Sequence, residues 1–379
     1  MSIHDFNEIR PYSGDEIKEA IKRIVEAPEL EAVANFLLPG EDLEKLKEGI
    51  RSSKTKHEFQ INLMDKVMRA IAARYTDGIT SEGIEDLETG EASLFLANHR
   101  DIILDSSFLA MLMLEKGYKT SEMTWGDNLM VTPFIVDVGK VNGMITVFRD
   151  GTPRELLKNS QRLSAYIRNA IVERKESVWI AHHKGRAKDG NDKTDVSVIK
   201  MLLLSGENSP KEKLLELNIR TVTISYEWEP CDARKVNELY HSKNKVYVKD
   251  KMEDLESIIG GVLAPKGRVH LVMSKPLTDK IKEVPGNLNT NETAAKVAEI
   301  VDLQINRDYK LWPSNYLAYD ILNKSSRFAV KYGDDVKDRL EERYKNTVKL
   351  VGIDNREIRD LFLTIYANPV ANKLKNGFL

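Results

Sequence analysis

The middle of the chain alternates short apolar runs with longer amphipathic segments. The apolar runs have the length of buried strands and occupy residues 93–97, 144–148, 178–181, 221–225 and 269–273. Segments with helical spacing lie between or after them, at 107–116, 153–174 and within 250–260. This alternation predicts an α/β fold in which helices flank a mixed, largely parallel sheet on both faces.

The two ends of the chain carry a helical pattern instead. Ile17, Ile21 and Ile24 form one apolar stripe, and the same spacing recurs at 59–73. Helical spacing returns late in the chain, at 292–304 and 336–345. We therefore expect three parts, with a boundary in the Gly-, Thr- and Glu-rich stretch 76–90. They are an N-terminal helical domain (1–90), an α/β domain (91–288) and a helical C-terminal region (289–379).

The composition is that of a soluble globular protein, with 41% hydrophobic and 31% charged residues. The formal net charge is only −2, but residues 1–90 are acidic on balance and the remainder is basic, which would suit anionic substrates. Cys231 is the single cysteine, so no internal disulfide forms and a reducing cytoplasm is expected. We expect no signal peptide, because residues 1–10 are polar, and no apolar run approaches the roughly 18 residues of a membrane span.

The most informative stretch follows the first apolar run. Residues 94–97 end at Asn98-His99-Arg100-Asp101, and Asp105 precedes a buried helical segment. Strand, polar turn and helix together place side chains at the carboxyl edge of a sheet, where open α/β folds bind ligands. A histidine beside a carboxylate can act as a general base. Each residue also has a purely structural interpretation, since Asp105 can cap the helix and His99 can be a hydrogen-bonded loop residue.

Two further stretches place cations after strands. Arg149 ends the segment Gly143-Met144-Ile145-Thr146-Val147-Phe148-Arg149. The loop after strand 178–181 carries glycines, which let a backbone approach a ligand, and several cations, which neutralise phosphate. Its notable residues are His182, His183, Lys184, Gly185, Arg186, Lys188, Gly190, Lys193 and Thr194. A basic loop is often merely solvated, but the position of this one after a buried strand favours a site.

In this order the stretches resemble the sequence blocks of the glycerolipid acyltransferases, in particular the glycerol-3-phosphate acyltransferase branch. Asn98-His99-Arg100 with a following aspartate resembles the first block, H-x-x-x-x-D, and Gly143–Arg149 resembles the second. Gly185-Arg186 with the later Lys193-Thr194 resembles the third, and Thr221-Val222-Thr223-Ile224-Ser225-Tyr226-Glu227 the fourth. Two departures stand out. His99 and Asp105 are one residue further apart than the family pattern, and His183 stands where the family has glutamate.

The resemblance implies an α/β acyltransferase domain that transfers a fatty acyl group from acyl-CoA or acyl-ACP to the hydroxyl of glycerol 3-phosphate or a related lysophospholipid. His99 would be the general base and Asp105 its partner, with Asp101 as second choice. Arg149, His183, Gly185, Arg186 and Lys193 would bind the phosphate-bearing acceptor, and the fourth block would only position other residues. Backbone N–H groups at the start of the helix after Asp105 would stabilise the oxyanion. No cofactor, metal or nucleic acid is implied, and the protein would act in the cytoplasm, peripherally at the inner face of the membrane.

Two other interpretations stay open. His99, Asp101, Asp105, His182 and His183 are residue types that bind metals, so the chain could be a metal-dependent phosphoesterase. The altered spacing and the histidine at position 183 are also compatible with an inactive lipid-binding homologue.

Overall fold

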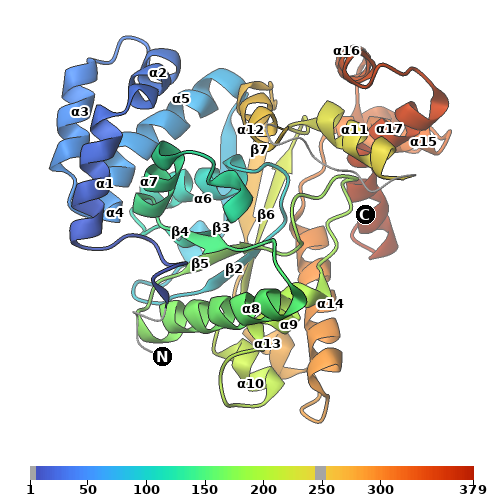
Figure 1. Ribbon diagram of the computed structural model, residues 1–379. Helices are drawn as coiled ribbons and strands as arrows, with labels where there is room; N and C mark the ends of the chain where they lie inside the picture. Colours follow the sequence, from blue (N-terminus) through green and yellow to red (C-terminus); the bar gives the residue numbers. More distant parts are fainter. Residues whose placement is uncertain (1–5, 244–252) are drawn as a thin grey trace.

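The structure, a computed structural model, describes residues 6–243 and 253–379. A seven-stranded sheet lies at its centre, with the strand order β1-β7-β6-β2-β5-β3-β4 (Figure 1). The strands are β1 (Ile79–Glu82), β2 (Leu94–Ala97), β3 (Glu122–Gly126), β4 (Met144–Val147), β5 (Val178–Ala181), β6 (Arg220–Tyr226) and β7 (Val269–Met273). All neighbours are parallel except β6 and β7. The predicted α/β class and largely parallel sheet are therefore confirmed.

The helices fall into an N-terminal group, a central group and a C-terminal group. The first is α1 (Asp15–Glu26), α2 (Pro28–Leu37), α3 (Leu43–Ser52), α4 (Lys56–Phe59) and α5 (Asp65–Tyr75). The central helices are α6 (Leu104–Glu115), α7 (Pro133–Val141), α8 (Pro153–Arg168), α9 (Val196–Leu202), α10 (Pro210–Leu215), α11 (Asp232–Ser242), α12 (Glu253–Leu263) and α13 (Thr278–Lys282). The last are α14 (Thr290–Asp308), α15 (Pro313–Leu322), α16 (Asp334–Val351) and α17 (Arg356–Lys375). The predicted helix within 250–260 matches α12 from residue 253, and its first residues lie outside the described part of the chain.

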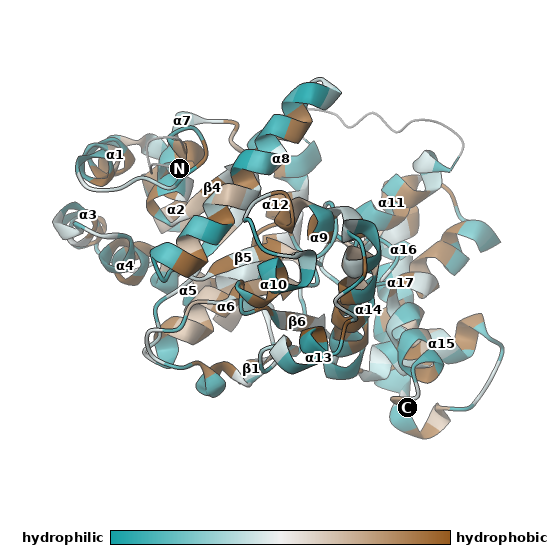
Figure 2. Ribbon diagram, turned by 90° about the horizontal axis from the view of Figure 1, so that it is seen from below, coloured by the Kyte–Doolittle hydropathy of each residue, from teal (hydrophilic) through white to brown (hydrophobic). Residues whose placement is uncertain are grey.

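Apolar residues on the two faces of the sheet build two cores. Phe95, Trp179 and Ile224 point to one face and pack with the N-terminal helices, α6 and α7. Leu96 and Ile180 point to the other face and pack with α8, α9 and α14. This division follows from the alternation of side chains along each strand. The covering helices accordingly have a hydrophilic and a hydrophobic side (Figure 2).

A third core lies beyond one end of this three-layer body. It joins α11 to α15, α16 and α17 through Trp228, Leu317, Leu340, Phe362 and Tyr366. In Figure 1 these C-terminal helices, in red, lie on the opposite side of the sheet from the blue N-terminal helices. The division of the chain at residues 90 and 288 stays a prediction. One strand of the sheet, β1 at residues 79–82, lies before the first of these boundaries.

The sequence pattern did not predict two of the strands, β1 and β3, and each omission has a physical reason. β1 is an edge strand in which only alternate residues are even partly buried, so it contains no apolar run. β3 begins with Glu122, a buried carboxylate that accepts hydrogen bonds from Tyr166 and Arg174. A charge at a buried strand position is tolerated when such partners satisfy it. No described helix has both the length and the apolar character needed to cross a bilayer.

Candidate active site

The turn between β2 and α6 brings His99 and Asp105 together. β2 ends at Ala97 and α6 begins at Leu104, so His99 lies on the turn and Asp105 in the first turn of the helix. Nδ1 of His99 lies 2.9 Å from Oδ2 of Asp105. Since an ionised carboxylate only accepts hydrogen bonds, this contact places the ring proton on Nδ1. Nε2 makes no hydrogen bond to a described residue and is the nitrogen left for a substrate.

Asp105 is held from several directions. Its Oδ2 also accepts hydrogen bonds from the backbone N–H groups of Arg100, at 2.6 Å, and Asp101, at 3.0 Å. Its Oδ1 accepts one from the hydroxyl of Tyr226, at 2.8 Å. Both oxygens are thus occupied and the side chain is buried. Such a carboxylate can fix the ring orientation and tautomer of His99 without moving.

Asp101 has the capping role that Asp105 could have had. Its Oδ1 accepts hydrogen bonds from the N–H groups of Ile103, at 3.0 Å, and Leu104, at 2.9 Å, at the start of α6. Burial, together with the nearby charge of Asp105, raises the pKa of Asp101. Asp101 thus occupies the N–H groups of Ile103 and Leu104, which precede Asp105, and the expectation that N–H groups after Asp105 stabilise an oxyanion stays a prediction.

His99 lines a pocket of about 270 Å³ at the carboxyl edge of the sheet. The pocket draws residues from the ends of four adjacent strands, because parallel strands end at the same edge. They include His99 after β2, Trp179 and Arg186 of β5 and its loop, Gly126 of β3, and Arg149 after β4. The indole of Trp179 packs edge-to-face against His99, with ring centroids 5.5 Å apart.

The pocket is cationic and keeps charges available for a ligand. The side chains of Arg149, Lys184 and Arg186 make no hydrogen bond or ion pair with a residue that the structure describes. Nη1 of Arg186 is enclosed by protein and has no hydrogen-bond partner among the described residues. Lys188, by contrast, forms an ion pair with Glu238 of α11. An arginine with unused donors is a common binding group for phosphate or carboxylate.

Not all predicted acceptor-binding residues converge here. Arg149, Gly185 and Arg186 line the pocket with His99, whereas His183 and Lys193 are exposed and do not line it. Further along this loop, Asp192 is buried and accepts a hydrogen bond from Arg100. Burial raises the pKa of the Asp302 carboxyl on α14. The charge of Lys193 opposes this effect and lowers the same pKa by a smaller amount.

A second pocket, of about 220 Å³, adjoins the first and is mainly apolar. Phe134, Ile135 and Val138 of α7 and Ile258 of α12 are among its lining residues. The two pockets share four residues, namely Trp125, Asn128, Leu129 and Asp254. The Nδ2 group of Asn128 donates to Oδ2 of Asp254 at 2.7 Å in this shared wall. The cationic pocket, which His99 lines, is thus adjacent to the apolar pocket.

The ligand set of the phosphoesterase interpretation is not assembled. Within residues 6–243 and 253–379, no three His, Cys, Asp or Glu side chains are arranged to hold a metal ion. His182 is buried, with Nδ1 3.1 Å from the hydroxyl of Thr194, and burial lowers its pKa to about 4. His183 is exposed to solvent. The adjacent histidines therefore do not join His99 in one cluster.

The sequence did not single out Trp179 and Glu238 as residues of the site, whereas it did include Tyr226. Tyr226 belongs to the fourth block, which was expected only to position other residues, and its bond to Asp105 is a role of that kind. Trp179 resembled any buried strand residue, and Glu238 any polar residue of a helix. No local signal marks these two, because their contacts join segments far apart in the chain.

Comparison with protein families and with curated proteins gives no match to this chain. Among solved structures, similarity is found to the 1-acyl-sn-glycerophosphate (LPA) acyltransferase, PlsC, from Thermotoga maritima. The TM-score is 0.40 and the sequence identity 12%, over 78% of this chain and 96% of that chain. Similarity at that level does not support an argument about function, which therefore rests on the residues of the site.

Proposed function

We propose that this protein is an O-acyltransferase that moves a fatty acyl group from a thioester to the hydroxyl of an anionic acceptor. The observation that carries the proposal is the His99–Asp105 pair at 2.9 Å, facing a pocket whose arginines have no partner in the described part of the chain and which adjoins an apolar pocket. The order of the sequence blocks supports the same reaction class. Glycerol 3-phosphate or a lysophospholipid is the proposed acceptor, and acyl-CoA or acyl-ACP the proposed donor.

In the proposed reaction, His99 acts as a general base. An alcohol attacks a thioester poorly unless its proton is removed as the new bond forms. Nε2 of His99 takes that proton while the acceptor oxygen bonds to the thioester carbonyl carbon. The tetrahedral intermediate then expels the thiolate, which receives the proton back from the imidazolium. Asp105 stabilises the imidazolium and holds its ring, so the acceptor hydroxyl replaces the serine of a Ser-His-Asp site.

The cationic wall would bind the acceptor phosphate. Arg149 and Arg186 offer planar N–H donors that no described carboxylate uses. Gly126 makes room for this arrangement, because a Cβ atom there would lie 2.6 Å from Nε of Arg149. The same cations would also lower the energy of the oxyanion.

The apolar pocket would hold the acyl chain, which links the reaction to a lipid surface. Val131, which lines this pocket, leaves 53% of its surface exposed, and Ile259, next in sequence to the lining residue Ile258, leaves 51%. Contiguous exposed apolar surface is found where proteins contact a membrane, another protein or a ligand. We therefore propose peripheral association at a membrane through this surface.

Acyl transfer from a radiolabelled acyl thioester to a panel of hydroxyl acceptors tests the proposed function. We expect product with a phosphate-bearing acceptor, and loss of turnover in a folded His99→Ala variant. His57→Ala is a matched control, since His57 belongs to helix α4 and does not line the pocket. Equal rates for wild type and His99→Ala would refute the assignment, as would a preference for uncharged alcohols.

A further inference from the structure

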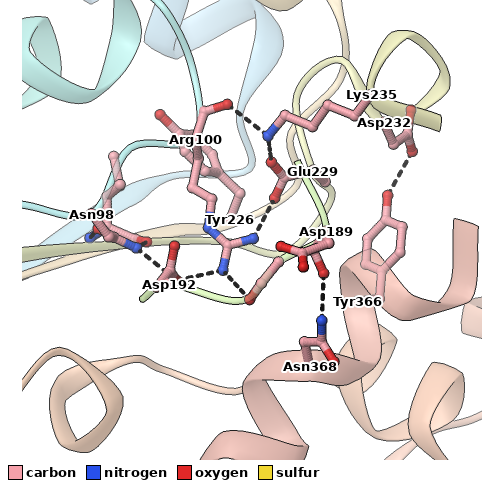
Figure 3. A network of polar contacts seen from close by, with 12 residues as sticks. Asn98, Arg100, Asp189, Asp192, Tyr226, Glu229, Asp232, Lys235, Tyr366 and Asn368 are labelled. Atoms are coloured by element: carbon pink, nitrogen blue, oxygen red, sulfur yellow. Dashed lines mark hydrogen bonds and ion pairs between the residues drawn. The ribbon is translucent and has the colours of Figure 1, made fainter. Parts of the chain in front are cut away.

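Four charged side chains lie together in the interior beneath the His99 turn. They come from the turn, the loop after β5, the segment after β6 and α11, and we call them the Arg100 cluster (Figure 3). Its members are Arg100, Asp192, Glu229 and Lys235, whose side chains are at most 4% exposed. Two cations thus balance two carboxylates.

Lys235 contacts the His99 turn directly. Its Nζ donates to the backbone carbonyl of Arg100 at 2.8 Å and forms an ion pair with Glu229 (Figure 3). The backbone N–H of Arg100 donates to Asp105 at 2.6 Å. The residue that follows His99 is therefore held at both of its backbone polar groups, by Asp105 on one side and by Lys235 on the other.

Arg100 connects the same cluster to the cationic loop. Its guanidinium donates to Oδ2 of Asp192 at 2.6 Å and to the carbonyl of Gly190 at 3.2 Å, both in the loop that carries Arg186. A third bond, at 3.3 Å, reaches Glu229. The cluster thus ties the turn of the proposed base to the loop of the proposed anion-binding arginine.

Burying such a charged cluster costs free energy. Each charge loses its hydration on burial, and apolar side chains of similar volume often give equal or greater stability. The cluster fixes geometry in a way that apolar packing cannot, because each hydrogen bond has a preferred length and direction. A role in orienting the site accounts for it better than a role in stability.

We propose that Lys235 is a positioning residue for His99, acting through the backbone carbonyl of Arg100. This inference rests on the proposed function only in treating His99 as the base. Lys235 does not line the pocket, and its ammonium is buried against Arg100 and Glu229. It therefore acts on the reaction through the turn and not by contact with substrate.

The test compares Lys235→Met, which keeps the side-chain length and removes the donor, with Lys235→Met/Glu229→Gln. The single variant leaves the cluster with excess negative charge, and the double variant restores its balance. We expect the double variant to regain stability but to keep a kcat lowered about 10–100-fold, the loss typical when an orienting group is removed, with acceptor KM little changed. Recovery of kcat together with stability would overturn the proposal.

Tyr366→Phe is the matched control. Its hydroxyl donates to Asp232 at 2.6 Å next to the cluster, without contacting residue 100 (Figure 3). We expect lower stability and an unchanged kcat. Should this variant lose kcat as Lys235→Met does, the effect would be general and the proposal would fail.

A second readout needs no substrate. Nitrogen NMR of the His99 ring, assigned by comparison with His99→Ala, reports which nitrogen carries the proton. We expect one Nδ1–H tautomer in wild type and Tyr366→Phe, and mixed or broadened signals in both Lys235 variants. An unchanged ring spectrum in the folded double variant would overturn the proposal. If wild type shows no acyl transfer at all, the proposed function fails, and this spectrum alone still decides the role of Lys235.

Discussion

Oδ2 of Asp105 lies 2.9 Å from Nδ1 of His99, although Asp101 is much nearer in sequence. The nearer aspartate points to the start of α6 and caps it. The two carboxylates of this turn therefore have different roles. Asp101 caps α6, and Asp105 orients the histidine.

Asp105→Asn should lower the rate of acyl transfer about 10²–10⁴-fold, because the ring loses the acceptor that fixes its tautomer. Asp101→Asn should leave the rate nearly unchanged, since asparagine caps helices as well as aspartate does. Steady-state kinetics of both folded variants measures this. A larger loss for Asp101→Asn would mean that the assignment of the two aspartates is reversed.

Arg186→Ala and Arg149→Ala should each raise the KM of a phosphate-bearing acceptor about 10–100-fold, the usual value of a hydrogen bond to a charged group. The donor KM should change little. Lys193→Ala is the control, because Lys193 carries the same charge but lies outside the lining of the pocket. If Lys193→Ala changes acceptor KM as much as Arg186→Ala, phosphate binding is not confined to the pocket.

Asp101 should make the protein less stable as the pH rises. Burial raises the pKa of its carboxyl above the ordinary value of 3.8, so the folded state binds this proton more tightly than the unfolded state. Its contribution to the free energy of unfolding therefore falls as pH increases from about the ordinary value through the raised one. Asp101→Asn cannot ionise and should lack this decline. Urea denaturation of both proteins over that pH range measures the difference, and parallel curves would contradict it.

Gly190→Ala should destabilise the protein by about 1–3 kcal/mol more than Gly352→Ala. Both glycines have a φ of +75°, so both substitutions carry the same backbone strain. A Cβ atom at 190 would lie 2.0 Å from the carbonyl oxygen of Ile365 in α17, whereas one at 352 would meet nothing within 4 Å. Free energies of unfolding from urea titrations give the comparison. Equal losses would show that α17 does not pack closely against this loop.

Val131→Glu and Ile259→Glu should reduce flotation with liposomes, because each places a charge on the apolar surface proposed to contact the membrane. Val330→Glu is the control, since Val330 is 93% exposed but lies among the C-terminal helices. Undiminished flotation of the first two variants, or equal loss in all three, would rule out this surface as the membrane contact.

The sequence by itself determined the fold class and the elements that carry the site. Four apolar residues ending at a polar turn predict the strand before His99, and a buried helical pattern predicts α6, because side-chain periodicity follows local backbone geometry. The cations of the loop after β5 could be predicted as site residues because they directly follow a predicted strand.

The tertiary structure decided which of these residues work together. Tyr226 donates to Asp105, Lys188 forms an ion pair with Glu238, and the N–H of Thr194 donates to Asp302. Each partner lies far away along the chain, so the pairing depends on strand order and on the path of a loop. Periodicity contains no information about either, because it reports only which side of its own element a residue occupies.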